Sequence, residues 1–113
     1  MSASEDPWIR GLRETVLEGP GVTSTALRAR IVARGAGDAV ADGDHEGLTS
    51  AVSQYVDRIR DAAHTMDDQD LERLREDGYD DDGVFEVTVV AAVGAGLARL
   101  ERVRALLRAE ASR

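Results

Sequence analysis

Glu86 is a carboxylate inside an apolar run, where its surroundings could prepare it for proton transfer. The run GVFEVTVVAAVGAGLA, residues 83–98, holds no other charged side chain. Burial there would raise the pKa of the carboxyl group into the range of a general base. The alternative is structural, because a glutamate in the first turns of a helix is favoured by the helix dipole or by pairing with an arginine. Both interpretations stay open, and Glu86 is one catalytic candidate.

His64 is the second catalytic candidate. It follows Asp61 by three residues and precedes Asp67 and Asp68. A carboxylate one helical turn away could orient the imidazole, and histidine is the side chain whose ordinary pKa lies nearest neutrality. The alternative is a histidine at a helix end or on the surface, without a chemical role.

Two acidic clusters could bind a divalent cation through their carboxylate oxygens. The first holds Asp42, Asp44, His45 and Glu46, and the second is the sequence DDDG at residues 80–83. Neither has the full Asp-x-Asp-x-Asp-Gly spacing with a closing glutamate that a calcium loop requires. Solvated loops and helix caps explain both clusters, so we predict no metal site.

The glycine pair Gly94-x-Gly96, which follows a run of β-branched residues, could belong to a dinucleotide-binding loop. That fingerprint needs a second strand and an acidic residue about 20 positions beyond the glycines. Only 17 residues follow Gly96 in the sequence, none of them strand-like, and Arg99 occupies the third glycine position. We therefore predict no bound cofactor.

A long helix over residues 81–108 accounts for the same stretch better. One apolar stripe recurs at the three- and four-residue spacing of a helix, and a second apolar face accompanies it in the first half. The stripe is Phe85, Val89, Ala92, Gly96, Leu100, Val103 and Leu107, and the second face is Val84, Val87, Ala91, Ala95 and Ala98. Such a helix belongs at the centre of a bundle, with Gly94 and Gly96 allowing a neighbouring helix to come close.

The rest of the sequence is also predicted to form mainly helices. Asp6-Pro7 begins the first, which carries Trp8, Leu12 and Val16 on one side and ends at EGPG, residues 18–21. A second begins at residue 23 or 24, carries Leu27 and Ile31 and stops near residue 35. We expect a loop over 35–47, a helix over 46–64 and a short capped helix over 67–78. The predicted fold is one all-α domain, residues 1–113, a small bundle of four to six helices.

Composition excludes several function classes. The chain of 113 residues has a net charge of −8, all its basic residues are arginine, and it has no cysteine. An acidic protein repels phosphate backbones, so we expect no nucleic-acid partner. Without cysteine there is no disulfide and no thiolate chemistry. The N-terminus lacks a signal-peptide pattern and the apolar stretch 89–98 is too short for a bilayer, so we expect a cytoplasmic protein with no membrane partner.

Residues 55–103 resemble the C-terminal part of the carboxymuconolactone decarboxylase and alkylhydroperoxidase-D-like superfamily. There a short acidic-capped helix, a glycine, an aromatic or apolar residue and another acidic cap lead into a long apolar helix. The matching residues are Asp67, Asp70, Leu71, Leu74, Gly78, Tyr79, Asp80, Phe85 and Glu86. The resemblance implies an alkylhydroperoxidase-D-like helical fold and assembly into trimers or hexamers. The family's peroxidase activity depends on a Cys-x-x-Cys pair that this chain lacks.

Two functions follow as hypotheses. The first is a non-catalytic, homo-oligomeric structural or accessory protein whose long C-terminal helix is shared between the core and a subunit interface. A further protein partner is compatible with this hypothesis. The second is a thiol-independent enzyme, similar to the decarboxylase branch, that uses Glu86 or His64 for acid–base catalysis on a small carboxylic substrate.

Overall fold

The structure, a computed structural model, describes residues 7–37 and 48–112. These residues form helices only: α1 (Pro7–Glu18), α2 (Thr25–Gly35), α3 (Ser50–Ala62), the 3₁₀ turn η2 (Ala63–Thr65), α4 (Asp68–Glu76) and α5 (Asp81–Ala111). No strand occurs in either described range, and the predicted all-α class is confirmed.

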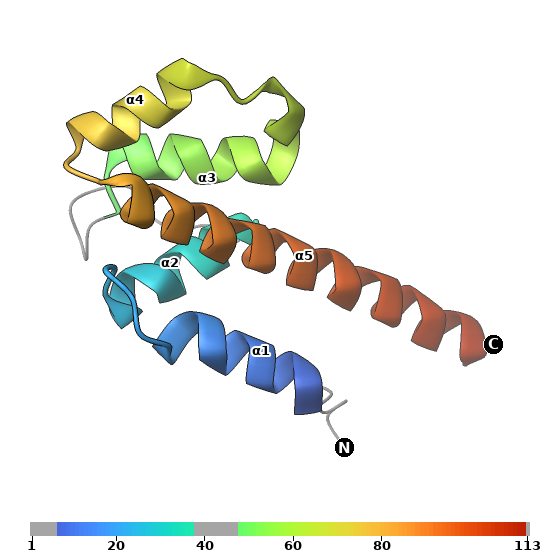
Figure 1. The fold of residues 1–113 in the computed structure, drawn as a ribbon. Coiled ribbons are helices and arrows are strands. Elements are labelled where there is room, and N and C mark those ends of the chain that lie inside the picture. The colour runs from blue at the N-terminus through green and yellow to red at the C-terminus, as the bar shows by residue number, and fades with distance from the viewer. Residues whose placement is uncertain (1–6, 38–47, 113) are drawn as a thin grey trace.

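The long helix α5 organises the fold. Figure 1 shows α1 and α2 on one side of it and α3 and α4 on the other. Helices α2 and α3 contact α5 and each other, so these three helices enclose the main core. The core side chains are Leu27, Ile31, Leu48, Val52, Tyr55, Val56, Leu74, Val84, Val87, Val90 and Ala91. Beyond Leu97 most of α5 is exposed, and Figure 1 shows its second half extending past the other helices.

Side-chain caps fix where four of the helices begin. Ser24 accepts a hydrogen bond from the backbone N–H of Leu27, and Thr49 accepts one from Val52. Asp67 forms a capping box at the start of α4, and Asp80 accepts from the backbone at the start of α5. Each cap contributes about 1 kcal/mol to stability. The caps at Asp67 and Asp80 were predicted, and α2 begins within one or two residues of the predicted start at 23 or 24, whereas α3 begins at Ser50 and not at residue 46.

The glycines of α5 have different surroundings. A Cβ atom added to Gly94 would lie 2.6 Å from the carbonyl oxygen of Val32 in α2, and one added to Gly35 would lie 2.8 Å from that of Ala91 in α5. Both distances are shorter than van der Waals contact, so only glycine lets the two backbones come this close. Gly96 has open space around it. The predicted close approach is confirmed at Gly94 and wrong at Gly96.

The faces of α5 and α1 are oriented differently from the prediction. Phe85 and Leu107 of the predicted stripe are 71% and 63% exposed, whereas Val87 and Ala91 of the second face are fully buried. The small residues of that second face let α2 pack closely, which Phe85 would prevent. In α1 the buried side chain is Ile9, and the predicted Trp8 and Leu12 are exposed.

Candidate functional site

The carboxylate of Glu86 binds the segment that joins α1 to α2. Its oxygens accept hydrogen bonds from the backbone N–H groups of Val22 (2.9 Å) and Thr23 (2.8 Å) and from the Thr23 hydroxyl. Arg28 of α2 donates to the same carboxylate, with Nη2 at 3.1 Å from Oε1. Four donors from two other parts of the chain therefore converge on one side chain of α5.

Arg28 is the buried cation of this network, with its side chain 5% exposed. Its Nε donates to the Thr23 hydroxyl at 3.0 Å, and its Nη1 donates to the carbonyl oxygen of Gly19 just after α1. A guanidinium has five N–H donors and presents them in a fixed fork, which suits this role better than a lysine would. The arginine thereby connects the end of α1, the linker and α5.

The pKa of Glu86 is lowered below its ordinary value of 4.5. Burial raises this pKa, but the hydrogen bonds from Thr23 and from the backbone N–H groups, together with the charge of Arg28, outweigh burial. The expectation that burial would raise the pKa toward that of a general base is therefore wrong. The structural alternative, a glutamate paired with an arginine in the early turns of a helix, describes the observed geometry.

An apolar groove lies beside Glu86, between the end of α1, the linker and α5. It has a volume of about 480 Å³ and is lined mainly by Val16, Pro20, Val22, Phe85 and Val89. Glu86 and Arg28 contribute the polar part of its wall. Val22 and Phe85 are largely exposed, so an apolar group that enters the groove would bury both.

The second catalytic candidate lies in a different part of the fold. His64 belongs to η2, in the connection between α3 and α4, and its side chain is exposed. Glu86 faces the linker between α1 and α2. The structure does not bring the two candidates into one site, and His64 lies exposed to water.

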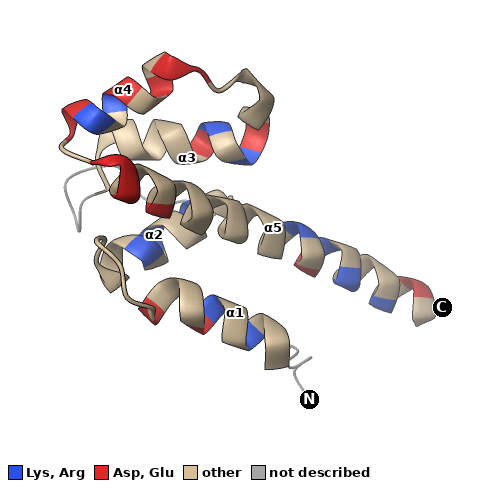
Figure 2. Cartoon of the chain, viewed as in Figure 1, with Lys and Arg blue, Asp and Glu red and all other residues tan. Residues whose placement is uncertain are grey.

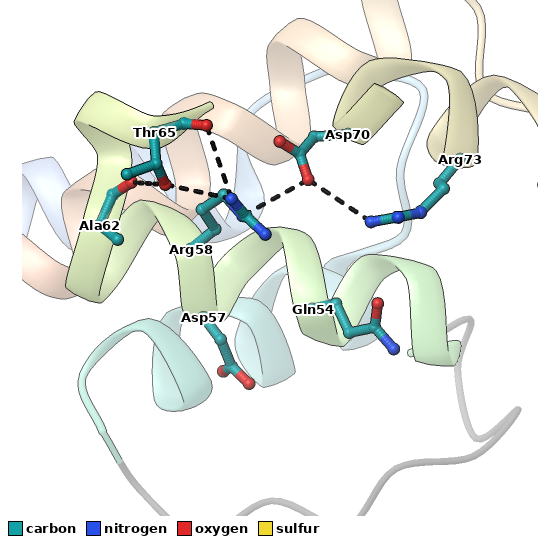
Figure 3. A pocket seen from close by; sticks show the side chains of 7 residues that line it. All are labelled: Gln54, Asp57, Arg58, Ala62, Thr65, Asp70 and Arg73. Carbon is teal, nitrogen blue, oxygen red and sulfur yellow. Dashed lines mark hydrogen bonds and ion pairs between the residues drawn. The ribbon is translucent and has the colours of Figure 1, made fainter. Parts of the chain in front are cut away.

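A second depression, of about 420 Å³, lies between α3 and α4 (Figure 3). The buried carboxylate of Asp70 lies there between two arginines, 3.4 Å from Arg58 Nε and 3.6 Å from Arg73 Nη1. The other oxygen of Asp70 accepts from the backbone N–H of Asp67 as part of the capping box. These charges hold the start of α4 against α3, which is a structural role.

The acidic clusters give no metal centre in the part of the chain described. Asp80 caps α5 through its Oδ1, which accepts from the N–H of Gly83 at 2.9 Å. Among residues 7–37 and 48–112 no group of three or more histidine or carboxylate side chains could hold a metal ion. The predicted cluster of Asp42, Asp44, His45 and Glu46 lies outside the described residues.

Arg28 and Thr23 are site residues that were not among the candidates predicted from the sequence. A signal for Arg28 was present. Leu27, Arg28, Ile31 and Gly35 share one helix face at three- and four-residue spacing. An arginine at such a position is buried only with a partner. Its partner Glu86 is 58 residues away, and no local pattern identifies it.

By length and composition α5 is long and apolar enough to cross a membrane, although its stretch 89–98 alone is too short to do so. Of its most apolar window of 18 residues, 44% is buried inside the protein. Packing within the chain therefore accounts for part of the apolarity of α5 and leaves another part exposed.

Comparisons with known protein families, with curated proteins and with solved structures find no match to this chain.

Proposed function

We propose that this chain is a non-catalytic protein that self-associates through α5 and has a structural or accessory role. One observation carries the proposal: α5 has a second apolar face on the side opposite its buried one. At 3.6 residues per turn, Val89, Ala92 and Gly96 lie about 180° around the helix from Val87, Ala91 and Gly94. The first three are exposed and the last three are buried.

Exposed apolar side chains recur along this face from the beginning of α5 to its last turns, and Leu100 between them is half-buried. Phe85 is 71% exposed, and Val103 and Leu107 are 52% and 63% exposed. Soluble monomers rarely leave a contiguous apolar surface of this kind in water, and a subunit interface is the usual way to cover it. The chemistry at Glu86 points the same way, because its carboxylate is engaged in holding the fold and its pKa is lowered.

The family relationship and the cellular setting belong to the same proposal. The order of α4, Gly78, the Asp80 cap and α5 supports a divergent, cysteine-less member of the alkylhydroperoxidase-D-like fold, for which trimers or hexamers would be expected. The net charge of −8 supports the absence of a nucleic-acid partner. A cytoplasmic location without membrane attachment completes the proposal.

The groove beside Glu86 favours a second candidate, a thiol-independent acid–base enzyme. The groove is large enough for a small molecule, and a carboxylate lies in its wall. Such an enzyme would bind a small carboxylic substrate near Arg28 and would lose turnover in Glu86→Gln. A screen of small carboxylic acids by ligand-observed NMR tests this candidate, and binding in the groove would favour it over the first.

Light scattering behind a sizing column tests the first candidate. The wild-type chain should elute as an oligomer of the 12.1 kDa protomer. Val103→Asp places a charge on the exposed stripe and should give a folded monomer, because a charge buried in an interface without a partner is strongly unfavourable. Ala105→Asp is the matched control, two residues away on another side of the same exposed helix end. A wild-type monomer at micromolar concentration would refute self-association.

A further inference from the structure

The outer apolar stripe of α5, in which every residue but the half-buried Leu100 is exposed, is symmetric about Gly96. Its members Phe85, Val89 and Ala92 precede Gly96 by 11, 7 and 4 residues. Leu100, Val103 and Leu107 follow it by 4, 7 and 11 residues. Gly96 is also the middle residue of α5, whose 31 residues run from Asp81 to Ala111. Two copies of the helix laid antiparallel would therefore bring every stripe position opposite another stripe position.

The side chains that such a pairing would bring together fit in size. Ala92 would face Leu100 of the second copy, so a small residue meets a large one. Val89 would face Val103, and Phe85 would face Leu107. At the centre Gly96 would meet Gly96, and open space surrounds the place where its Cβ would be. Close contact of two helix backbones is easiest at small residues, so the crossing point coincides with the position that best permits it.

The charges of α5 favour the same orientation. Asp80, Asp81 and Asp82 make its beginning acidic. Its second half carries Arg99, Arg102, Arg104 and Arg108 against Glu101 and Glu110, and Figure 2 shows this change from red to mostly blue along the helix. Antiparallel copies place the acidic beginning of one helix beside the basic end of the other. A parallel pair would place like charges together and align the two helix dipoles.

The pairing also explains what covers the groove beside Glu86. The second half of α5 extends past the other helices, with Val103 and Leu107 exposed. In an antiparallel pair this extension reaches the beginning of the other copy's α5, where Val22, Phe85 and Val89 line the groove. Leu107 of the second copy would arrive opposite Phe85. The extension of each copy then fills the groove of the other.

We infer that two copies of this chain pair antiparallel along α5, about a two-fold axis at Gly96, with the C-terminal half of each helix seated in the apolar groove beside Phe85 of the other. The inference rests on the proposed self-association and adds to it the partner segment, the orientation and the symmetry. Because the interface is isologous, any larger assembly contains an even number of chains.

Single cysteines give a direct test, since the native chain has none. Val89→Cys and Val103→Cys are each prepared alone, and also mixed in equal amounts with time for subunit exchange. A short bismaleimide is then added. In the antiparallel pair, the two cysteines of a single variant lie about 21 Å apart along the helix axis, whereas position 89 of one copy faces position 103 of the other. We expect a cross-linked band of twice the chain mass only in the mixture. About half of the protein should appear in this band, because half of the pairs that form at random contain one copy of each variant. Glu76→Cys, exposed on α4, should give no such band alone or in a mixture.

The remaining outcomes separate this inference from the function on which it rests. Cross-linking of Val89→Cys by itself would indicate a parallel or different interface and would overturn the antiparallel pair. An oligomer by light scattering without cross-linking in the mixture would also overturn it, and would leave self-association standing. A monomeric wild-type chain would overturn both.

Discussion

Removing the carboxylate of Glu86 should destabilise the protein strongly, because Glu86 neutralises a buried arginine. In Glu86→Ala the guanidinium of Arg28 keeps its place, 5% exposed, but loses its charged partner. Breaking a buried pair in this way costs about 3–5 kcal/mol. The Glu86 side chain is 21% exposed, so water can reach part of the gap, and we expect a loss of about 3 kcal/mol.

Such a loss is large against the whole stability of a domain, which is about 5–15 kcal/mol. Urea unfolding followed by circular dichroism measures it, with all variants at one protein concentration because association adds to apparent stability. Glu76→Ala, an exposed glutamate of α4, should change the free energy of unfolding by less than about 0.5 kcal/mol. A loss below about 1 kcal/mol in Glu86→Ala would show that the network does not hold the linker as described.

The same carboxylate predicts a pH dependence with a definite sign. The pKa of Glu86 is lower in the folded protein than its ordinary value of 4.5. Its contribution is therefore complete above about pH 4.5 and is lost as the pH falls through the folded pKa. The stability difference between wild type and Glu86→Gln, which cannot titrate, should stay constant near neutral pH and shrink in acid. A Glu86 pKa above 4.5 by NMR titration would contradict this and would reopen the general-base interpretation.

Three further predictions concern packing and chemistry. Gly94→Ala should destabilise the fold by about 1–2 kcal/mol, because the added methyl group would meet the carbonyl oxygen of Val32. Gly11→Ala should stabilise the fold by about 0.5–1 kcal/mol, because there is open space around Gly11 and alanine favours a helix more than glycine does. Urea unfolding measures both changes. Ser53 is 1% exposed, and its hydroxyl has no hydrogen-bond partner in the described ranges. Ser53→Ala should therefore raise the free energy of unfolding by up to about 1 kcal/mol in the same assay. A clear decrease would show that the hydroxyl does have a partner. Purified protein should not reduce peroxide with thiol reductants, because the chain has no cysteine, and turnover by metal-free, homogeneous protein in a coupled peroxide assay would contradict this.

The sequence predicted the helices well because their signals are local. Asp67 with Asp70, and Asp80 before an apolar run, are caps that act within one turn. The long helix was predicted from its spacing, and its start at Asp81 agrees with the structure, which extends it to Ala111.

The orientation of the faces could not be predicted in the same way. Helix α5 has two apolar faces, and hydrophobicity alone favours the one with Phe85 and Leu107 as the interior. The structure buries the face with Ala91 and Gly94, because close backbone contact with α2 requires small residues there. That requirement depends on a neighbour distant in the sequence.

In the candidate site, too, the local feature could be predicted from the sequence and the contacts with distant residues could not. Glu86 was identified because a lone carboxylate in an apolar run is a local signal. Its donors come from Val22, Thr23 and Arg28, at least 58 residues away, so neither the direction of its pKa shift nor its role could be derived from spacing.

Because of the way α1 is attached, its free energy of local unfolding should be lower than that of the rest of the fold. This helix buries only Ile9 fully, and Arg28 ties its end to the rest of the fold. Its amide hydrogens should therefore exchange with solvent through a local unfolding event that leaves α2, α3 and α5 intact. The molecule therefore combines a core of α2, α3 and α5 with a helix whose end is held by hydrogen bonds from Arg28 to backbone carbonyl oxygens.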